Sequence, residues 1–328
     1  WDGRVSEDAN DPAGFDTPAE DWLPKGLNSV LAAQALWPLS AQFEMAGNTG
    51  ENEVIGATRQ RMDYGWPILT TRVASQDFYW DQFRAIDPTL IRRDQLSITH
   101  IANALADFMN LTFRSVNAPI DRLARGEPIQ ISEAAQRGLD LFYGEAHCHQ
   151  CHSGPLMTDQ QYHHIGLPPF GPGRTRQWDP HARDLGRLAE TSRSEDRYRF
   201  RTPSLRNVTL TAPYGHNGTY RTLTGIIQHH LNPHQALAKY DRSQVILPNL
   251  PHLATRDWHT LDDRLEMARF VESIGIQPLS LTDRDITDLV AFLALLEDDS
   301  AIRKARDAFM ATQADSAVSH DPLGQSIE

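Results

Sequence analysis

The stretch Cys148-His149-Gln150-Cys151-His152 holds both cysteines of the chain, separated by two residues and followed at once by a histidine. This CxxCH spacing is typical of the attachment site of a c-type haem. Each thiol forms a thioether to one vinyl group of the porphyrin, and the histidine binds the iron. The sequence therefore predicts a covalent haem on Cys148 and Cys151 with His152 as proximal ligand.

Two other uses of a CxxC pair fit less well. A thioredoxin-like dithiol would begin a helix after a strand, whereas the segment before Cys148 has a helical pattern. A zinc site would need four ligands converging from two separated knuckles. The candidate zinc ligands here are crowded into six positions, 147–152.

The chain has 328 residues, a formal net charge of −12 and a hydrophobic fraction of 40%, which is enough for two compact domains. The acidic balance argues against nucleic acid as a partner. Lysines occur only at Lys25, Lys239 and Lys304, so a lysine ring that docks on an acidic partner is not expected. No membrane span is predicted, because the longest apolar run, Leu289 to Leu296, is too short.

The expected fold class is all-α, built from cytochrome c-like haem domains with long haem-wrapping loops. The hydrophobic pattern divides the chain into residues 1–125, an N-terminal domain; 126–310, the domain that carries CxxCH; and 311–328, a polar tail.

Helical periodicity predicts several elements. Expected helices are those from Ser29 to Leu39, after the cap Ser97, from Ser132 to Gly144, and after Thr282 with Asp285 in the capping-box position. Residues 1–28 and 153–220 lack a period, and a long loop of this kind is reasonable where it surrounds a haem.

The sixth iron ligand follows from helical spacing. Thr222 is a candidate N-cap for a helix in which Leu223, Ile226, Ile227 and His230 share one face, so His230 is expected to point to the core and His229 away. The alternative for His230 is a buried histidine bonded to a carbonyl. Competing ligands are Met157, Met267 and Met310.

Further motifs carry a resemblance that covers nearly the whole chain. They are Cys148 to Pro155, Ile165-Gly166-Leu167, Phe200 to Asn207, Leu210 to Gly218, and Leu289 to Leu293. Together these motifs resemble the bacterial dihaem cytochrome c peroxidase family, which includes the methylamine-utilisation enzyme MauG.

The resemblance implies roles for particular residues. Trp1 of Trp1-Asp2-Gly3-Arg4 would bridge two haems, and Gln34 and Glu44 would line the pocket where peroxide reacts. Glu44 would carry a proton between the peroxide oxygens, as a carboxylate can. The backbone carbonyls of Thr211 and Pro213 would bind calcium, which prefers hard oxygen donors. His230 falls on the axial position of the electron-relay haem.

The chain departs from the family pattern in three ways. The family has a second CxxCH before the tryptophan, and this sequence begins at that tryptophan, so it is read as mature, processed or incomplete at its start. The segment from Arg4 to Gln34 is longer than usual and includes Trp22. His230 stands where the family has methionine or tyrosine.

The resemblance implies a periplasmic oxidoreductase that reduces hydrogen peroxide at an N-terminal haem c, with electrons relayed through the haem on His152. Its expected partners are a small c-type cytochrome or another redox protein, and an oligomer is possible. Two alternatives stay open: a non-enzymatic electron-transfer subunit, and MauG-like oxidation of residues in a partner protein.

Overall fold

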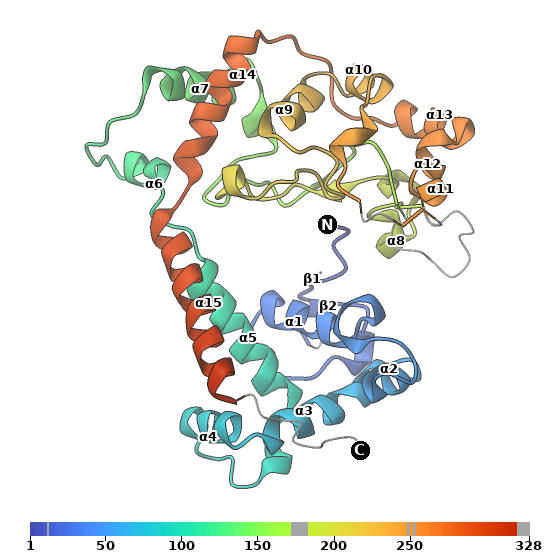
Figure 1. The fold of residues 1–328 in the computed structure, drawn as a ribbon, viewed down its shortest axis with the longest axis vertical. Helices are drawn as coiled ribbons and strands as arrows, with labels where there is room; N and C mark the ends of the chain where they lie inside the picture. The colour runs from blue at the N-terminus through green and yellow to red at the C-terminus, as the bar shows by residue number, and fades with distance from the viewer. Residues whose placement is uncertain (12, 172–182, 248–249, 252–253, 320–328) are drawn as a thin grey trace. The chain divides into compact units, whose positions relative to one another are not determined.

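The computed structural model describes residues 1–11, 13–171, 183–247, 250–251 and 254–319, and the chain divides into two compact units. Residues Arg4–Arg114 form the N-terminal unit, whereas Trp1–Gly3 cluster with Ser115–Glu328 in the C-terminal unit. The expected all-α class is confirmed in its main feature, because both units are mostly helical and their strands are short (Figure 1).

The N-terminal unit consists of helices around a small core. Its elements are β1 (Ser6–Glu7), β2 (Phe15–Asp16), η1 (Glu20–Trp22), α1 (Val30–Ser40), the π-type turn η2 (Gln42–Ala46), α2 (Glu53–Thr58), η3 (Met62–Tyr64), α3 (Gly65–Ser75), α4 (Asp77–Ile86), η4 (Arg93–Gln95) and α5 (Ile98–Phe113). Strands β1 and β2 pair antiparallel, with Ser6 opposite Asp16.

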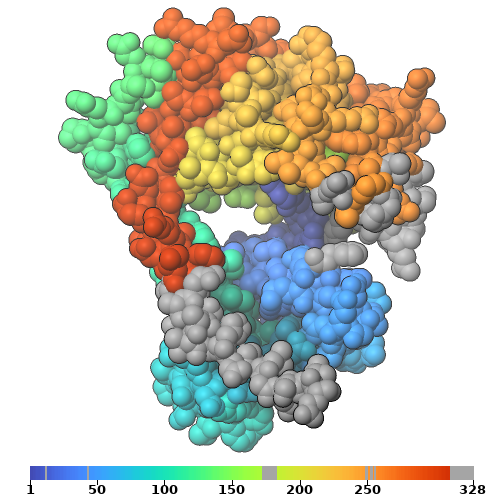
Figure 2. Space-filling model, in the orientation of Figure 1, coloured from blue at the N-terminus to red at the C-terminus, as the bar shows by residue number. Residues whose placement is uncertain are grey.

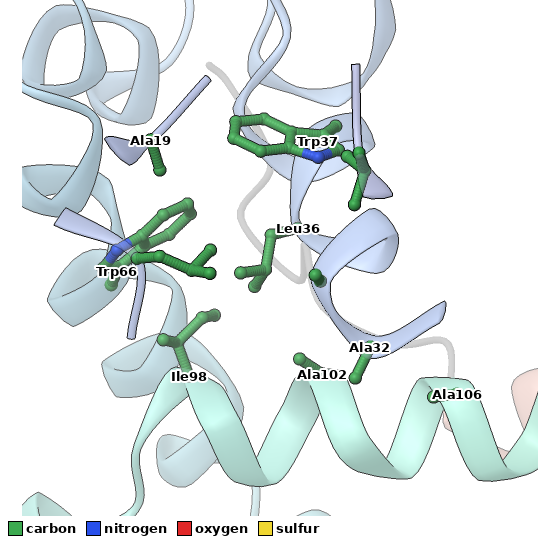
Figure 3. Close-up of a cluster of buried hydrophobic side chains, with 11 residues drawn as sticks. Ala19, Ala32, Leu36, Trp37, Trp66, Ile98, Ala102 and Ala106 are labelled. Carbon is green, nitrogen blue, oxygen red and sulfur yellow. The ribbon is translucent and has the colours of Figure 1, made fainter. Parts of the chain in front are cut away.

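Helix α1 packs on α5 because both helices present small residues at the contact. Ala32 and Ala102 are fully buried there. Leu36 of α1 points into the space bounded by Trp37, Trp66 and Ile98 (Figure 3). The Ser29 hydroxyl oxygen accepts a hydrogen bond of 3.2 Å from the Ala32 amide. Ser29 therefore caps the start of α1, as the sequence predicts.

The C-terminal unit carries the CxxCH motif. Its elements are α6 (Pro119–Ala124), α7 (Glu133–Tyr143), η5 (Cys148–Gln150), β3 (Tyr162–His163), α8 (Leu188–Thr191), η6 (Ser194–Asp196), β4 (Phe200–Arg201), η7 (Val208–Leu210), α9 (Leu223–Leu231), α10 (Pro233–Ala238), η8 (Arg242–Gln244), α11 (Ala254–Asp257), α12 (His259–Asp262), α13 (Arg264–Glu272), α14 (Asp283–Leu293), η9 (Ala294–Leu296) and α15 (Asp299–Ser319). The segments 233–247 and 254–272, drawn in light orange, contribute to the surface of this unit (Figure 2).

The main helical contact of this unit is between α7 and α14 (Figure 1). Phe142 and Phe292 meet there with ring centroids 4.8 Å apart. A Cβ added to Gly138 would lie 1.9 Å from the Asp288 carbonyl oxygen, so only glycine permits this close approach. The close packing of α7 on α14 therefore fixes the position at which the chain leaves α7.

The predicted caps of this unit are confirmed. The Ser132 hydroxyl accepts a hydrogen bond from the Ala135 amide, and the Thr222 hydroxyl accepts one from the Gly225 amide. Thr282 forms a capping box with Asp285. The helix after Thr282 is followed by α15, which the sequence reading did not predict. Helix α15 covers the first part of the expected polar tail, and residues 320–328 lie outside the described residues.

Candidate functional site

Helix α7 delivers the CxxCH motif through a tight turn. The helix ends at Gly144, and the His147 amide donates to the Gly144 carbonyl at 3.1 Å. The His152 amide then donates to the Cys148 carbonyl at 2.9 Å, which closes the turn around η5. Both thiols and the His152 ring are therefore presented by one short segment that is anchored to the α7–α14 pair.

The two thiols are reduced and partly buried. Burial raises the pKa of Cys148 to about 11 and also raises the pKa of Cys151. Catalytic dithiols instead have a lowered thiol pKa. The thiols of this motif are therefore unsuited to thiol–disulfide exchange.

The ligand geometry of a zinc knuckle is also not found among the described residues. A Cys151 sulfur, an Asp159 oxygen and a His163 nitrogen lie within 4.8 Å of one another, which gives only three candidate ligands. The hydrogen bond of 2.8 Å between His163 Nε2 and Asp159 accounts for two of the three. A structural zinc site needs four ligands.

His152 has the features of a haem ligand. Its Nδ1 bonds the Met157 carbonyl at 3.2 Å, and iron-binding histidines usually make this kind of bond at the nitrogen that does not face the metal. Burial, together with the charge interaction with His230, lowers the pKa of His152 to about 4. The ring is therefore neutral near pH 7, as metal binding requires.

His230 has a matching arrangement on helix α9. Its Nδ1 bonds the Ile226 carbonyl, one turn earlier, at 2.8 Å. Burial lowers the pKa of His230, so this ring is also held in the neutral form. Cys148 of the motif and Ile226, one turn before His230, both pack against the same buried core of the C-terminal unit. The residues present therefore fit a haem c bound by two cysteines and two histidines.

The prediction that His229 turns away from the core is wrong, because His229 is fully buried. Its Nδ1 bonds the Tyr220 hydroxyl and its Nε2 bonds the Ile165 carbonyl, both at 2.8 Å. Helix α9 is covered on a second side by these residues, and a pattern of apolar positions alone does not detect a buried polar side. Since both nitrogens of His229 are occupied, His230 is the better candidate of the pair.

The methionine competitors have unfavourable positions. The Met157 carbonyl bonds His152, so Met157 lies beside the proximal ligand and not opposite it. Its side chain is buried in the core beside Tyr143. Met310 is 59% exposed, and Met267 is partly exposed on α13.

The remaining candidates lie in several places. Gln34 on α1 and Glu44 on the adjacent turn η2 are both exposed side chains of the N-terminal unit. The Trp1 carbonyl accepts the Arg201 amide at 2.8 Å, which ties Trp1 to the C-terminal unit. Thr211 and Pro213 lie in an exposed turn after η7.

A group of buried polar side chains lies outside the residues for which the sequence predicts a role. His216 stacks on Phe200 with ring centroids 3.5 Å apart, and its Nδ1 is buried without a hydrogen-bond partner. Glu266, which is 2% exposed, accepts hydrogen bonds from Tyr198 and Arg183. No periodic signal marks such residues, because their partners are distant in sequence.

Comparisons with known proteins identify the relatives of the chain. A family model described as di-haem cytochrome c peroxidase matches residues 1–128. The chain is 31% identical over 337 residues to the cytochrome-c peroxidase IdrP1 of Denitromonas iodatirespirans, covering 90% of this chain and 78% of that protein. It is 30% identical to the methylamine utilization protein MauG of Methylorubrum extorquens, covering 84% of this chain and 60% of that protein.

Solved structures share the fold. A MauG-like protein associated with microbial copper homeostasis has a TM-score of 0.56 and 27% identity, covering 85% of this chain and 72% of that chain. The diheme peroxidase BthA from Burkholderia thailandensis has a TM-score of 0.53 at 20% identity, covering 83% of this chain and 64% of that one. Among the described residues, no helix combines the length and the apolar character that crossing a bilayer requires. With its CxxCH motif, its histidine pair and this extent of similarity, the chain belongs to the dihaem cytochrome c peroxidase and MauG family and is a peroxidase-type oxidoreductase.

Proposed function

We propose that the haem on Cys148 and Cys151 is bound by His152 and His230 and serves to transfer electrons. The observation that carries the proposal is that each histidine bonds a backbone carbonyl through Nδ1, at 3.2 Å for His152 and 2.8 Å for His230. These bonds fix the ring that binds iron. A haem iron with two histidine ligands supplies one-electron chemistry and has no open position for peroxide.

We assign peroxide reduction to the N-terminal unit, at a second haem c. Glu44 would accept the proton of the peroxide oxygen nearer the metal and return it to the leaving hydroxide. Gln34 would orient the substrate by hydrogen bonds. Two features support this assignment: both side chains are exposed and free to face a bound group, and Glu44 lies in a π-type turn, a feature frequent at functional sites.

The remaining parts of the proposal follow the family. Trp1 would conduct electrons between the haems, and the carbonyls of Thr211 and Pro213 would bind calcium. The long segments 153–171 and 183–220 would surround the porphyrin. The periplasm is the proposed compartment, since haem c is attached outside the cytoplasm. The proposed electron donor is a small c-type cytochrome or another redox protein.

The sequence left a non-enzymatic electron carrier open, and the peroxidases among the similar proteins argue against it. Haem stoichiometry of the native protein tests the division of labour proposed above. Two haems support it, and one haem contradicts it. MauG-like oxidation of residues in a partner protein would use the same two haems, and oxidised residues in a co-purified partner would distinguish it.

The test of ligation uses the two neighbouring histidines. His230→Ala is expected to convert the haem from low-spin to high-spin, as seen in its ferric absorption spectrum. His229→Ala is expected to keep the low-spin spectrum but to lower stability, because it leaves the buried Tyr220 hydroxyl without its partner. A methionine-to-iron charge-transfer band in the unmodified protein would contradict His230 as ligand.

A further inference from the structure

A row of aromatic rings leads from the candidate ligand His230 to a partly exposed tryptophan. Successive ring centroids are 6.3 Å apart for His230 and His229, 5.3 Å for His229 and Tyr220, 5.7 Å for Tyr220 and Tyr240, and 6.2 Å for Tyr240 and Trp258. Rings 4.5–7 Å apart are neighbours in contact. All five residues belong to the C-terminal unit.

We propose that Tyr220, Tyr240 and Trp258 form an electron path between the haem bound by His152 and His230 and the protein surface at Trp258. This inference rests on the ligation proposed above. Electron tunnelling slows steeply with distance, so several short steps between oxidisable rings carry an electron faster than one long step through aliphatic side chains. Tyrosine and tryptophan are the side chains that can be oxidised in this way.

The first step has a proton acceptor in place. The Tyr220 hydroxyl and His229 Nδ1 are 2.8 Å apart, and His229 Nε2 lies 2.8 Å from the Ile165 carbonyl. A carbonyl only accepts, so Nε2 carries the hydrogen and Nδ1 is left to accept from the phenol. Both residues are buried, Tyr220 being 4% exposed, which keeps water from competing for this hydrogen bond.

The electron and proton balance is then complete. The haem bound by His152 and His230 is oxidised when it passes an electron to the second haem that reacts with peroxide. When Tyr220 replaces that electron, its phenolic proton shifts along the hydrogen bond to His229 Nδ1, which leaves a neutral tyrosyl radical beside a protonated imidazole. One electron from an external donor then passes through Trp258 and Tyr240 to Tyr220, and the proton returns. The donor is oxidised by one electron and the haem is reduced by one.

Tyr240 has a different role from Tyr220. Its hydroxyl donates to the Thr219 carbonyl at 2.7 Å, and a carbonyl is too weak a base to take the proton. Tyr240 therefore conducts between its neighbours without storing the oxidised state. The stored state belongs to Tyr220, which has an imidazole as partner.

Both ends of the path are fixed by local contacts. At the inner end, a Cβ added to Gly225 of α9 would lie 3.1 Å from Tyr220 Cδ1, so glycine lets the helix lie close to the tyrosine ring. At the outer end, the Arg242 guanidinium lies 5.0 Å from the centroid of the Trp258 ring, and Arg242 also pairs with Asp262. The indole is therefore held in position where a donor protein can reach it.

The test uses flash photolysis of the intact holoprotein. Both native cysteines are taken up by the haem, so a single Arg256→Cys substitution at an exposed position near Trp258 can carry a ruthenium photo-oxidant. The rate at which the flash-oxidised label withdraws an electron from the ferrous haem is followed by haem absorbance. Trp258→Phe and Tyr220→Phe are expected to slow this rate severely, and Trp258→Tyr, which keeps an oxidisable ring, is expected to restore part of it.

Two controls make the result specific. Tyr79→Phe, on the exposed surface of the other unit, should leave the rate unchanged. A label placed by Arg284→Cys, on α14, should give a rate that does not depend on Trp258. The ferric spectra of the path variants should stay low-spin, which separates loss of the path from loss of His230 ligation. If the Arg256→Cys label gives the same rate in the unmodified path, in Trp258→Phe and in Tyr220→Phe, the path is wrong. This conclusion does not depend on the outcome of the His230→Ala test of ligation.

Discussion

In the C-terminal unit the candidate ligands His152 and His230 are each fixed at Nδ1 by a backbone carbonyl, whereas in the N-terminal unit Gln34 and Glu44 are exposed. The first arrangement orients the rings before the haem arrives, and a pre-oriented ligand loses little freedom on binding. The second arrangement leaves both side chains free to change conformation, so their orientation depends on the group that they contact. The two units therefore differ in how much of their chemistry is built into the folded chain.

The cores of the units differ in a similar way. The N-terminal core joins helices α1 and α5 through fully buried alanines such as Ala32 and Ala102. The C-terminal core also includes residues from non-helical segments, namely Met157, Leu167, Tyr214 and Tyr220, which come from the long stretch after the CxxCH motif. Such segments are held by turns and side-chain packing and lack the continuous hydrogen-bond ladder of a helix, so we expect the C-terminal unit to depend more on its cofactor.

The largest expected effect comes from removing both thioethers. In the double variant Cys148→Ser and Cys151→Ser, the haem on His152 should be released by acidified organic solvent, whereas in the unmodified protein it should resist extraction. Thermal unfolding of the C-terminal unit should shift to lower temperature, because a group bound only by the folded state stabilises it. Haem that extracts from the unmodified protein would contradict covalent attachment.

The next effect concerns the N-terminal unit. Glu44→Gln in the native holoprotein keeps the shape of the side chain and removes the base, so peroxide turnover should fall by about 10²- to 10⁴-fold. Glu53→Gln provides a matched control, since Glu53 is an exposed acid of the same unit. Steady-state peroxide consumption at saturating donor measures both variants. Equal losses in the two would indicate a general charge effect and not a proton transfer at Glu44.

A pair of glycine substitutions compares the packing of the two units. Gly138→Ala would place a methyl group 1.9 Å from the Asp288 carbonyl oxygen, so α7 and α14 must separate. Overpacking of this kind costs about 1–3 kcal/mol or more. Gly56→Ala on α2 meets no atom within 4 Å and should be neutral or stabilising by up to about 1 kcal/mol. Urea unfolding curves check both, and a stable Gly138→Ala protein would show that the helix contact is adaptable.

Much of the fold was predictable where local rules decide it. The helices that begin at Ser29, Ser132, Thr222 and Thr282 have N-caps and apolar stripes, and the structure confirms all four. The α15 helix was missed because its sequence is polar and shows no clear apolar stripe. Its start depends on Asp298, whose partners Val116 and Asn117 are far away in sequence.

The site residues were predictable where they belong to a short sequence motif. CxxCH predicts three haem-binding residues directly. His230 was selected by helical spacing, but the same spacing misplaced His229, because its partners Tyr220 and Ile165 come from other segments. The ring path from Tyr220 to Trp258 has no sequence period at all. It exists only once the loops and helices of the C-terminal unit are folded together.

The smallest expected effect concerns Asp298, the residue that ties α15 to the first residues of the C-terminal unit. Its carboxylate is 1% exposed and accepts the Val116 and Asn117 amides at 2.8 Å each, as well as the Ser300 and Ala301 amides. Burial raises the pKa of Asp298, but these hydrogen bonds together with the one from the Ser300 hydroxyl outweigh it and lower the pKa from 3.8 to about 2. The folded state therefore prefers the ionised carboxylate.

The pH dependence that follows has a defined sign. Because the folded pKa of Asp298 lies below the unfolded value, its contribution to the free energy of unfolding is present above pH 3.8 and is lost as the pH falls toward 2. The contribution is about 2 kcal/mol. Urea unfolding at pH 6 and pH 3 should show that Asp298→Asn loses stability mainly at pH 6, so that its pH dependence is shallower. If the two proteins have parallel pH profiles, the amide bonds to Asp298 do not secure the start of the C-terminal unit, and its boundary at Ser115 must be held by other contacts.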